Sequence, residues 1–230
     1  DPAWLKRSAD AYRAAGEILA GYDRAISQRN LGMALSMQGF YANDADVLRQ
    51  SVEAFDRALL HIPKADMPQE WARTEGNRAE SLLALAGLEP QSDYLQQGVT
   101  AIRAATDILE RDRSPMDWAL AQHYLGDAEL RIAKLSNEAA DYRRSIAAFE
   151  RALEVWTRER SEIDWATANA RMAEALELLG SVTADKTMVR HARDITAQAA
   201  AAMSAAGYSH NDSYFNSRLA SIDATLEGMK

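Results

Sequence analysis

The chain has 230 residues, of which 47% are hydrophobic and 26% charged, with a formal net charge of −8 and no cysteine. These values are ordinary for a folded soluble protein, and they exclude disulfides, thiol nucleophiles and cysteine-based zinc sites. An acidic chain has no excess of Lys and Arg to displace counterions from phosphates, so we expect no nucleic-acid partner.

The residue pattern predicts an all-α protein of about ten helices. Only 5 Pro and 11 Gly interrupt the chain, and it is rich in residues that lose little freedom in a helix. Ser114 and Ser161 each precede a carboxylate by three residues, as in a capping box, and Asp46 is placed to cap a second helix. In chain order the helices are predicted at 2–20, 23–40, 46–61, 68–87, 93–111, 115–135, 141–158, 162–180, 186–206 and 211–228.

Tryptophans reveal an internal repeat. Trp71, Trp118 and Trp165 are separated by 47 residues each, and periods of roughly 20 to 50 residues are typical of stacked repeat proteins. Because they recur at helix starts beside Ala, we interpret these tryptophans as core residues between repeats. The frame predicts an N-terminal helix (1–23), four repeats (24–70, 71–117, 118–164 and 165–211) and a C-terminal capping helix (212–230), all in one array (1–230).

Two repeats resemble the tetratricopeptide pattern. Its elements are Leu-Gly in the first helix, then a small residue, an aromatic and an Ala in the second, followed by Pro. They stand here as Leu31-Gly32, Ser51, Phe55, Ala58 and Pro63, and as Leu125-Gly126, Ser145, Phe149 and Ala152.

The resemblance implies a solenoid of stacked antiparallel helix pairs whose concave face binds a peptide or helix. The common tetratricopeptide unit has 34 residues rather than 47, and Arg78-Ala79 and Met172-Ala173 replace Leu-Gly in the other two repeats. Other helix-pair solenoids have periods near 40 to 47 residues, and they are the structural alternative.

A polar stripe along the first helices is the predicted partner-binding site. Its columns lie opposite the apolar columns that build the core. Arg and Asn would donate to a ligand backbone and carboxylates, and the interleaved acids favour a mixed-charge protein or peptide segment. The alternative is a solvated helix face. The predicted residues are Arg29, Asn30, Met33, Arg73, Asn77, Glu80, His123, Tyr124, Asp127, Arg171, Glu174 and Arg218.

We expect no enzyme activity, no cofactor and no metal. The four histidines, His61, His123, His191 and His210, fall in different columns and form no metal-spaced pair. No glycine-rich phosphate loop opens a helix. No apolar run approaches the roughly 20 residues that cross a bilayer, so no membrane insertion is expected. Cysteine usage leaves the compartment open, with the cytoplasm slightly favoured.

We therefore predict a non-catalytic protein-interaction scaffold. The alternative is a regulatory or oligomerisation module of a larger signalling or enzymatic protein, since the chain begins Asp1-Pro2 without an initiator Met. Terminal helices rich in apolar residues would then support self-association, or would only cap the array. These residues are Trp4, Leu5, Tyr12, Tyr214, Phe215, Leu219 and Ile222.

Overall fold

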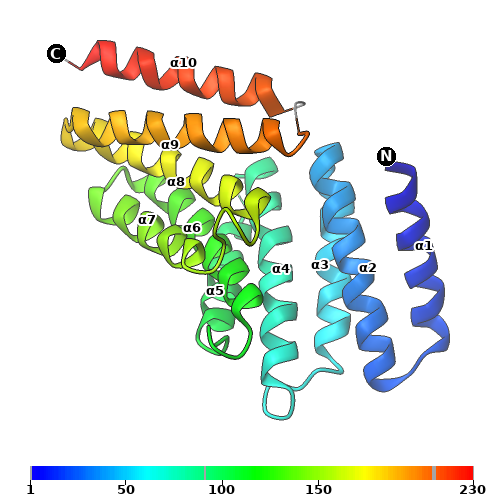
Figure 1. The fold of residues 1–230 in the computed structure, drawn as a ribbon. Coiled ribbons are helices and arrows are strands. Elements are labelled where there is room, and N and C mark those ends of the chain that lie inside the picture. Colours follow the sequence, from blue (N-terminus) through cyan, green and yellow to red (C-terminus); the bar gives the residue numbers. More distant parts are fainter. Residues whose placement is uncertain (1, 91, 209–210, 230) are drawn as a thin grey trace. The chain divides into compact units, whose positions relative to one another are not determined.

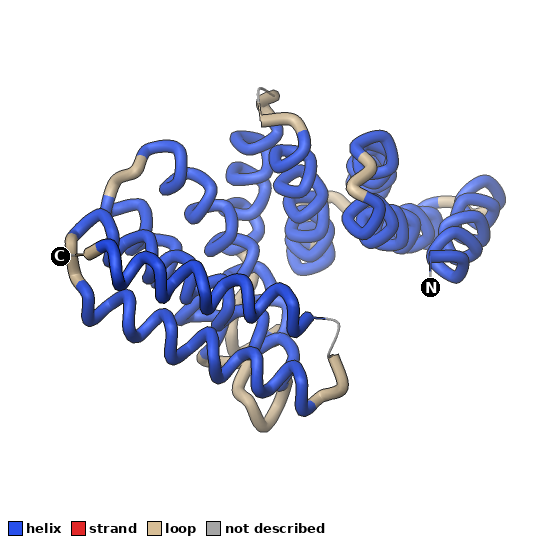
Figure 2. Tube along the Cα trace, turned by 90° about the horizontal axis from the view of Figure 1, so that it is seen from above, coloured by secondary structure: helices blue, strands red, loops and turns tan. Residues whose placement is uncertain are grey.

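A computed structural model describes residues 2–90, 92–208 and 211–229 of the chain. Helices joined by short loops make up these ranges, which contain no strand (Figure 2). Within each half of the chain, consecutive helices pack against each other, which confirms the predicted all-α class of sequential helix pairs. The chain divides into two compact units, residues 1–113 and 114–230, and each is described by itself.

The described part of the first unit, residues 2–90 and 92–113, contains five helices, and successive helices run in alternating directions (Figure 1). The first helices of its repeats, α2 and α4, also contact each other directly. In chain order the helices are α1 (Pro2–Ile18), α2 (Gly21–Ala42), α3 (Ala45–Leu59), α4 (Pro68–Leu88) and α5 (Tyr94–Thr106).

The second unit has the same plan. Its first helices, α6 and α8, contact each other as α2 and α4 do, and α10 packs on α9. Its helices are α6 (Pro115–Ser136), α7 (Ala139–Leu153), α8 (Glu162–Thr183), α9 (Lys186–Ala205) and α10 (Asp212–Gly228).

Helix boundaries repeat with the period seen in the tryptophans. Helices α2, α4, α6 and α8 begin at residues 21, 68, 115 and 162, which are 47 residues apart. Helices α5 and α7 end five residues before the predicted ends at 111 and 158. There the chain turns out of the helix and buries Leu109 and Trp156 in the core, a gain that continuing the helix would forfeit.

Local capping differs from the prediction. Asp44, rather than Asp46, caps α3, because its carboxylate accepts hydrogen bonds from the backbone N–H groups of Asp46 at 2.9 Å and Val47 at 3.1 Å. Ser114 makes no side-chain cap bond to its helix. Ser161 donates to the carboxylate of Asp164 instead of accepting from the backbone.

The columns that resemble tetratricopeptide residues meet in the core of each unit. A Cβ at Gly32 would lie 2.8 Å from the Phe55 ring, and the Ser51 hydroxyl donates to the Gly32 carbonyl at 2.7 Å. Gly126 stands in the same relation to Phe149, at 2.7 Å. Such distances leave no room for a methyl group, so glycine sets the spacing between the two helices of a hairpin.

Candidate functional site

The predicted site residues lie on the first helices of the repeats and on α10. The first unit carries Arg29, Asn30 and Met33 on α2 and Arg73, Asn77 and Glu80 on α4. The second unit carries His123, Tyr124 and Asp127 on α6, Arg171 and Glu174 on α8, and Arg218 on α10.

An exposed apolar strip runs along α2, and only its first residue was predicted. Met33, Met37, Phe40 and Tyr41 are exposed by 45%, 42%, 65% and 71%. Their spacing of i, i+4, i+7 and i+8 places them on one helix face, here called the α2 stripe. The rings of Phe40 and Tyr41 meet edge to face, with centroids 5.9 Å apart. Large exposed apolar surfaces of this kind mark sites where partners bind.

An ion pair joins α2 to α4 one helical turn before the α2 stripe. Arg29 on α2 donates to the carboxylate of Glu70 at the start of α4, and Glu70 also pairs with Arg73 at 3.0 Å. Asn30 and Asn77 are half-buried. This unit therefore combines an apolar helix face with a neighbouring polar one.

The same columns in the second unit form a chain of ion pairs, here called the charge ladder. Arg171 on α8 donates to Asp127 on α6 at 2.7 Å and also to Glu174. Glu174 in turn binds Lys134 of α6. The acids of the predicted polar stripe thus pair with its bases. This pairing occupies the Arg side chains that we expected to donate to a ligand.

A further pair joins α8 to α10. Arg218 donates to Glu177, whose carboxylate also accepts a hydrogen bond from the Thr225 hydroxyl at 3.0 Å. Glu177 is buried, and a buried carboxylate without such partners would be costly. These contacts stabilise the C-terminal helix on the repeat before it.

The ladder changes the ionisation of its members. Burial is the largest single influence and works against the charged forms of Asp127 and Glu174, but Arg171 and the other basic groups around them together outweigh it and lower the pKa of both carboxyls below their usual values. Both therefore stay charged at neutral pH, and the ladder is an ionised network rather than a set of neutral hydrogen bonds.

His123 is not part of the exposed stripe that we expected. It is only 7% exposed, and its ring packs against Phe149 and Trp156, with centroids 5.5 and 5.4 Å away. Burial lowers its pKa, although Asp127, whose Oδ2 lies 3.8 Å from Nε2, opposes the effect. His123 is thus a neutral core residue at pH 7.

A buried polar column was missed in the sequence. Gln28, Glu75, Gln122 and Asn169 follow one another at 47-residue spacing on the first helices, and all are buried or half-buried. The signal is a polar residue recurring in a column that faces the core. Glu75 is the one acid among them, and burial raises the pKa of its carboxyl.

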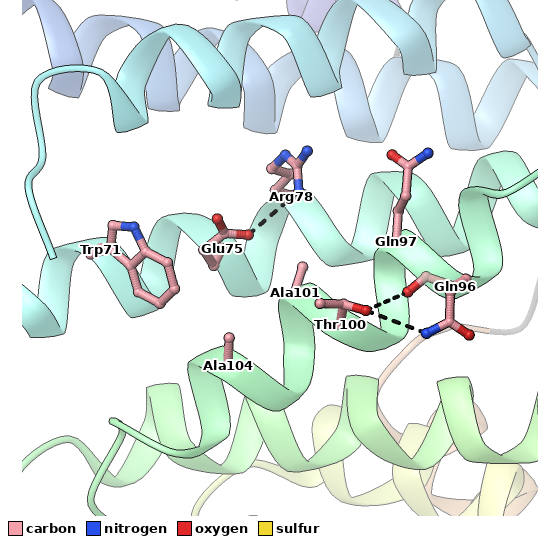
Figure 3. Close-up of a pocket in the computed structure, with 8 residues that line it drawn as sticks. All are labelled: Trp71, Glu75, Arg78, Gln96, Gln97, Thr100, Ala101 and Ala104. Carbon is pink, nitrogen blue, oxygen red and sulfur yellow. Dashed lines mark hydrogen bonds and ion pairs between the residues drawn. The ribbon is translucent and has the colours of Figure 1, made fainter.

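Glu75 lies in a cleft of about 370 Å³ between α4 and α5. Figure 3 shows Trp71, Glu75 and Arg78 in a row along α4, with side chains of α5 facing them. Arg78 Nε donates to Asp56 of α3 at 2.6 Å, and its Nη1 lies 3.6 Å from Glu75 Oε2. The α5 side is lined by Gln96, Gln97, Thr100, Ala101 and Ala104.

A related hollow of about 420 Å³ lies one repeat earlier. Arg24, Gln28 and Leu31 of α2 line it, and these positions correspond to Trp71, Glu75 and Arg78. The Gln28 side chain also approaches α1 closely there, because a Cβ at Gly16 would lie 2.3 Å from the Gln28 amide nitrogen. The two hollows thus share a repeat position but differ in charge.

The terminal helices bury some of the predicted apolar residues and expose others. Leu5 of α1 and Phe215 and Ile222 of α10 are buried, whereas Trp4 and Tyr214 are exposed by 48% and 45%. Tyr12 and Leu219 are half-buried. Each terminal helix therefore packs apolar side chains onto its neighbour and also carries an exposed aromatic residue, Trp4 on α1 and Tyr214 on α10.

Residues 2–90, 92–208 and 211–229 contain neither a metal-binding cluster nor a membrane-spanning helix. No group of three or more His, Asp or Glu side chains in these ranges is arranged to hold a metal ion. Nor is any helix of the described chain long and apolar enough to cross a membrane. His210, one of the four histidines considered above, lies outside the described residues.

Comparisons with known proteins identify no relative of this chain. No protein-family model matches it, and neither the curated proteins nor the solved structures contain a match. Any functional assignment therefore depends on the geometry described above.

Proposed function

We propose that this protein is a non-catalytic scaffold, built of tetratricopeptide-like repeats, that binds an amphipathic helix of a partner protein on the α2 stripe. The observation that carries the proposal is the exposure of four large apolar side chains on one face of α2. A solvated helix surface would carry polar residues there, and the other first helices do so at Glu80, Asp127 and Glu174.

The chemistry of the stripe suits a helical partner. Methionine side chains adapt to the shape of an opposing surface, and aromatic residues are enriched at interface centres. Anchors at i, i+3, i+4 and i+7 of a partner helix would lie along Met33, Met37 and Phe40. Arg29, Glu70 and Arg73 provide a rim of both charges beside them, so the partner segment would carry both charges as well.

The test is a pulldown from native extract with three versions of the full chain: wild type, Met33→Glu/Met37→Glu, and the control Ile18→Glu. Ile18 is 85% exposed and lies at the end of α1, away from the stripe. We expect the stripe variant to lose a protein that both others retain, with its affinity lowered more than about tenfold.

Mass spectrometry would identify the retained protein, and calorimetry with a peptide from its contacting helix would measure the affinity directly. If the stripe variant and the control bind the same proteins equally well, the α2 stripe is not the partner site.

The alternative is a regulatory or oligomerisation module, favoured by the exposure of Trp4 and Tyr214 on the terminal helices. Sedimentation of wild type and a Trp4→Ser/Tyr214→Ser variant distinguishes the two functions. Self-association lost in this variant, but kept in the stripe variant, would favour the alternative.

A further inference from the structure

The cleft between α4 and α5 departs from the repeat pattern at two positions that other repeats use for the core. Glu75 occupies the column of the amides Gln28, Gln122 and Asn169. Arg78 occupies the column of Leu31, Leu125 and Met172. Charged groups in a core-facing column lower the stability of a repeat. Their presence there therefore indicates a role that apolar residues could not perform, such as binding a ligand.

The two charges are held at fixed positions with unused hydrogen-bonding capacity. Glu75 Oε2 is buried and has no hydrogen-bond partner among the described residues. A guanidinium has five N–H donors; the contacts described for Arg78 use Nε, to Asp56, and Nη1, towards Glu75. The cleft thus offers a carboxylate and a guanidinium side by side.

The remaining walls complete a small amphipathic site. Trp71 provides an aromatic wall, Ala101 and Ala104 leave apolar space on α5, and Gln97 and Thr100 add neutral polar groups (Figure 3). A volume of about 370 Å³ is at the small end of the range for ligand pockets, which suits a molecule of amino-acid size.

We propose that this cleft binds a free zwitterionic α-amino acid with an apolar side chain. Glu75 would accept hydrogen bonds from the ligand ammonium, and Arg78 would donate to its carboxylate. Trp71 and the two alanines would contact the apolar side chain. The opposed charges of the ligand match the opposed charges of the site, so binding requires no net change of charge in a partly buried cleft.

The probe is L-leucine, titrated into the full chain by calorimetry while the Trp71 indole N–H signal is followed by NMR. We expect a Kd on the order of 0.1–1 mM, as for a ligand of this size. Leucinamide lacks the carboxylate and 4-methylpentanoate lacks the ammonium, so each should bind about tenfold more weakly.

The repeat itself supplies variants that keep the fold. Glu75→Gln and Arg78→Leu install the residues found at the same positions in the third repeat, Gln122 and Leu125. Each should lose L-leucine binding and still unfold at or above the wild-type temperature. The control Glu53→Gln makes the same carboxylate-to-amide change at an exposed residue that pairs with Arg57 outside the cleft, and should bind as wild type does.

The pH dependence gives an independent readout. Burial raises the pKa of Glu75, so affinity should fall on acidification at a pH where an ordinary Glu is still ionised. Equal binding of the tripeptides Leu-Gly-Gly or Gly-Gly-Leu would identify a peptide end, rather than a free amino acid, as the ligand and would overturn the proposal. Absence of binding to wild type, or unchanged binding by both cleft variants, would overturn it too.

Discussion

One repeat column carries an exposed Met on α2 of the first unit and paired acids on both first helices of the second unit. Met33 of α2 stands two repeats before Asp127 and three before Glu174. In the second unit these acids are tied to Arg171, whereas Met33 remains 45% exposed. The repeat fixes the backbone and the core columns, whereas the residue type in the outward columns differs from one repeat to the next.

Among the polar contacts that distinguish the two units, the largest expected effect comes from removing the centre of the charge ladder. Arg171→Ala leaves Asp127 and Glu174 partly buried without the guanidinium that pairs with both of them, and we expect a loss of about 2–3 kcal/mol in the free energy of unfolding. Urea denaturation of the full chain measures this loss, and hydrogen exchange assigns it to the second unit.

The matched control for that variant is an exposed ion pair in the same unit. Arg193 pairs with Asp223 at 2.6 Å, but the two side chains are 44% and 45% exposed, against 27% and 23% for Arg171 and Asp127. Solvent screens such a pair, so Arg193→Ala should change stability too little to resolve. Equal losses in the two variants would mean that the ladder contributes no more than a surface contact.

The second effect is a pH dependence confined to the second unit. The folded pKa of His123 lies below its unfolded value of about 6.5, so below that pH the unfolded chain binds a proton that the folded chain excludes. The unfolding free energy should therefore fall as the pH drops from 7.5 to 5.5, with a slope of at most about 1.4 kcal/mol per pH unit from this group.

Two variants separate His123 from other titrating groups. His123→Phe keeps an aromatic ring against Phe149 and Trp156 but cannot be protonated, so its stability should depend less on pH in this range. His191→Gln, at an exposed position of α9, should retain the wild-type dependence. Glu75, whose raised pKa acts in the opposite direction, is present in all three proteins and cancels. A wild-type slope in His123→Phe would contradict the assignment.

Most of the fold could be predicted from the sequence because residues at a few repeat positions determine the period and the packing of the helices. The period follows from the recurrence of Trp71 at 47-residue spacing, and Gly32 and Phe55 stand in two columns of the tetratricopeptide pattern that the structure brings into contact inside a hairpin. Helix ends were less predictable, since residues such as Trp156 are drawn from a predicted helix into the core. Local helix propensity does not include the free energy gained when such a side chain is buried in the core.

The candidate site was harder to predict than the fold. Residue type placed Arg171 and Asp127 on neighbouring helices but did not show that they bind each other, because pairing depends on the distance between helices that the core sets. His123 has a polar side chain in a column whose burial differs between repeats. The cleft at Glu75 depends on the small side chains of a different helix, α5, which no periodicity along α4 reveals.

The smallest expected effect on the unfolding free energy is at the α2 stripe of the first unit. Phe40 is 65% exposed, so Phe40→Ser removes little buried apolar area, and we expect the unfolding free energy to stay within about 0.5 kcal/mol of wild type. Phe55, fully buried on α3 of the same unit, is the matched aromatic, and Phe55→Ala should cost about 3–5 kcal/mol. Urea denaturation of both variants makes the comparison. A large loss in Phe40→Ser would show that the stripe packs within the chain; an unchanged stability, combined with weaker partner binding, would show that these side chains serve an interface and leave the stability of the unit to its core.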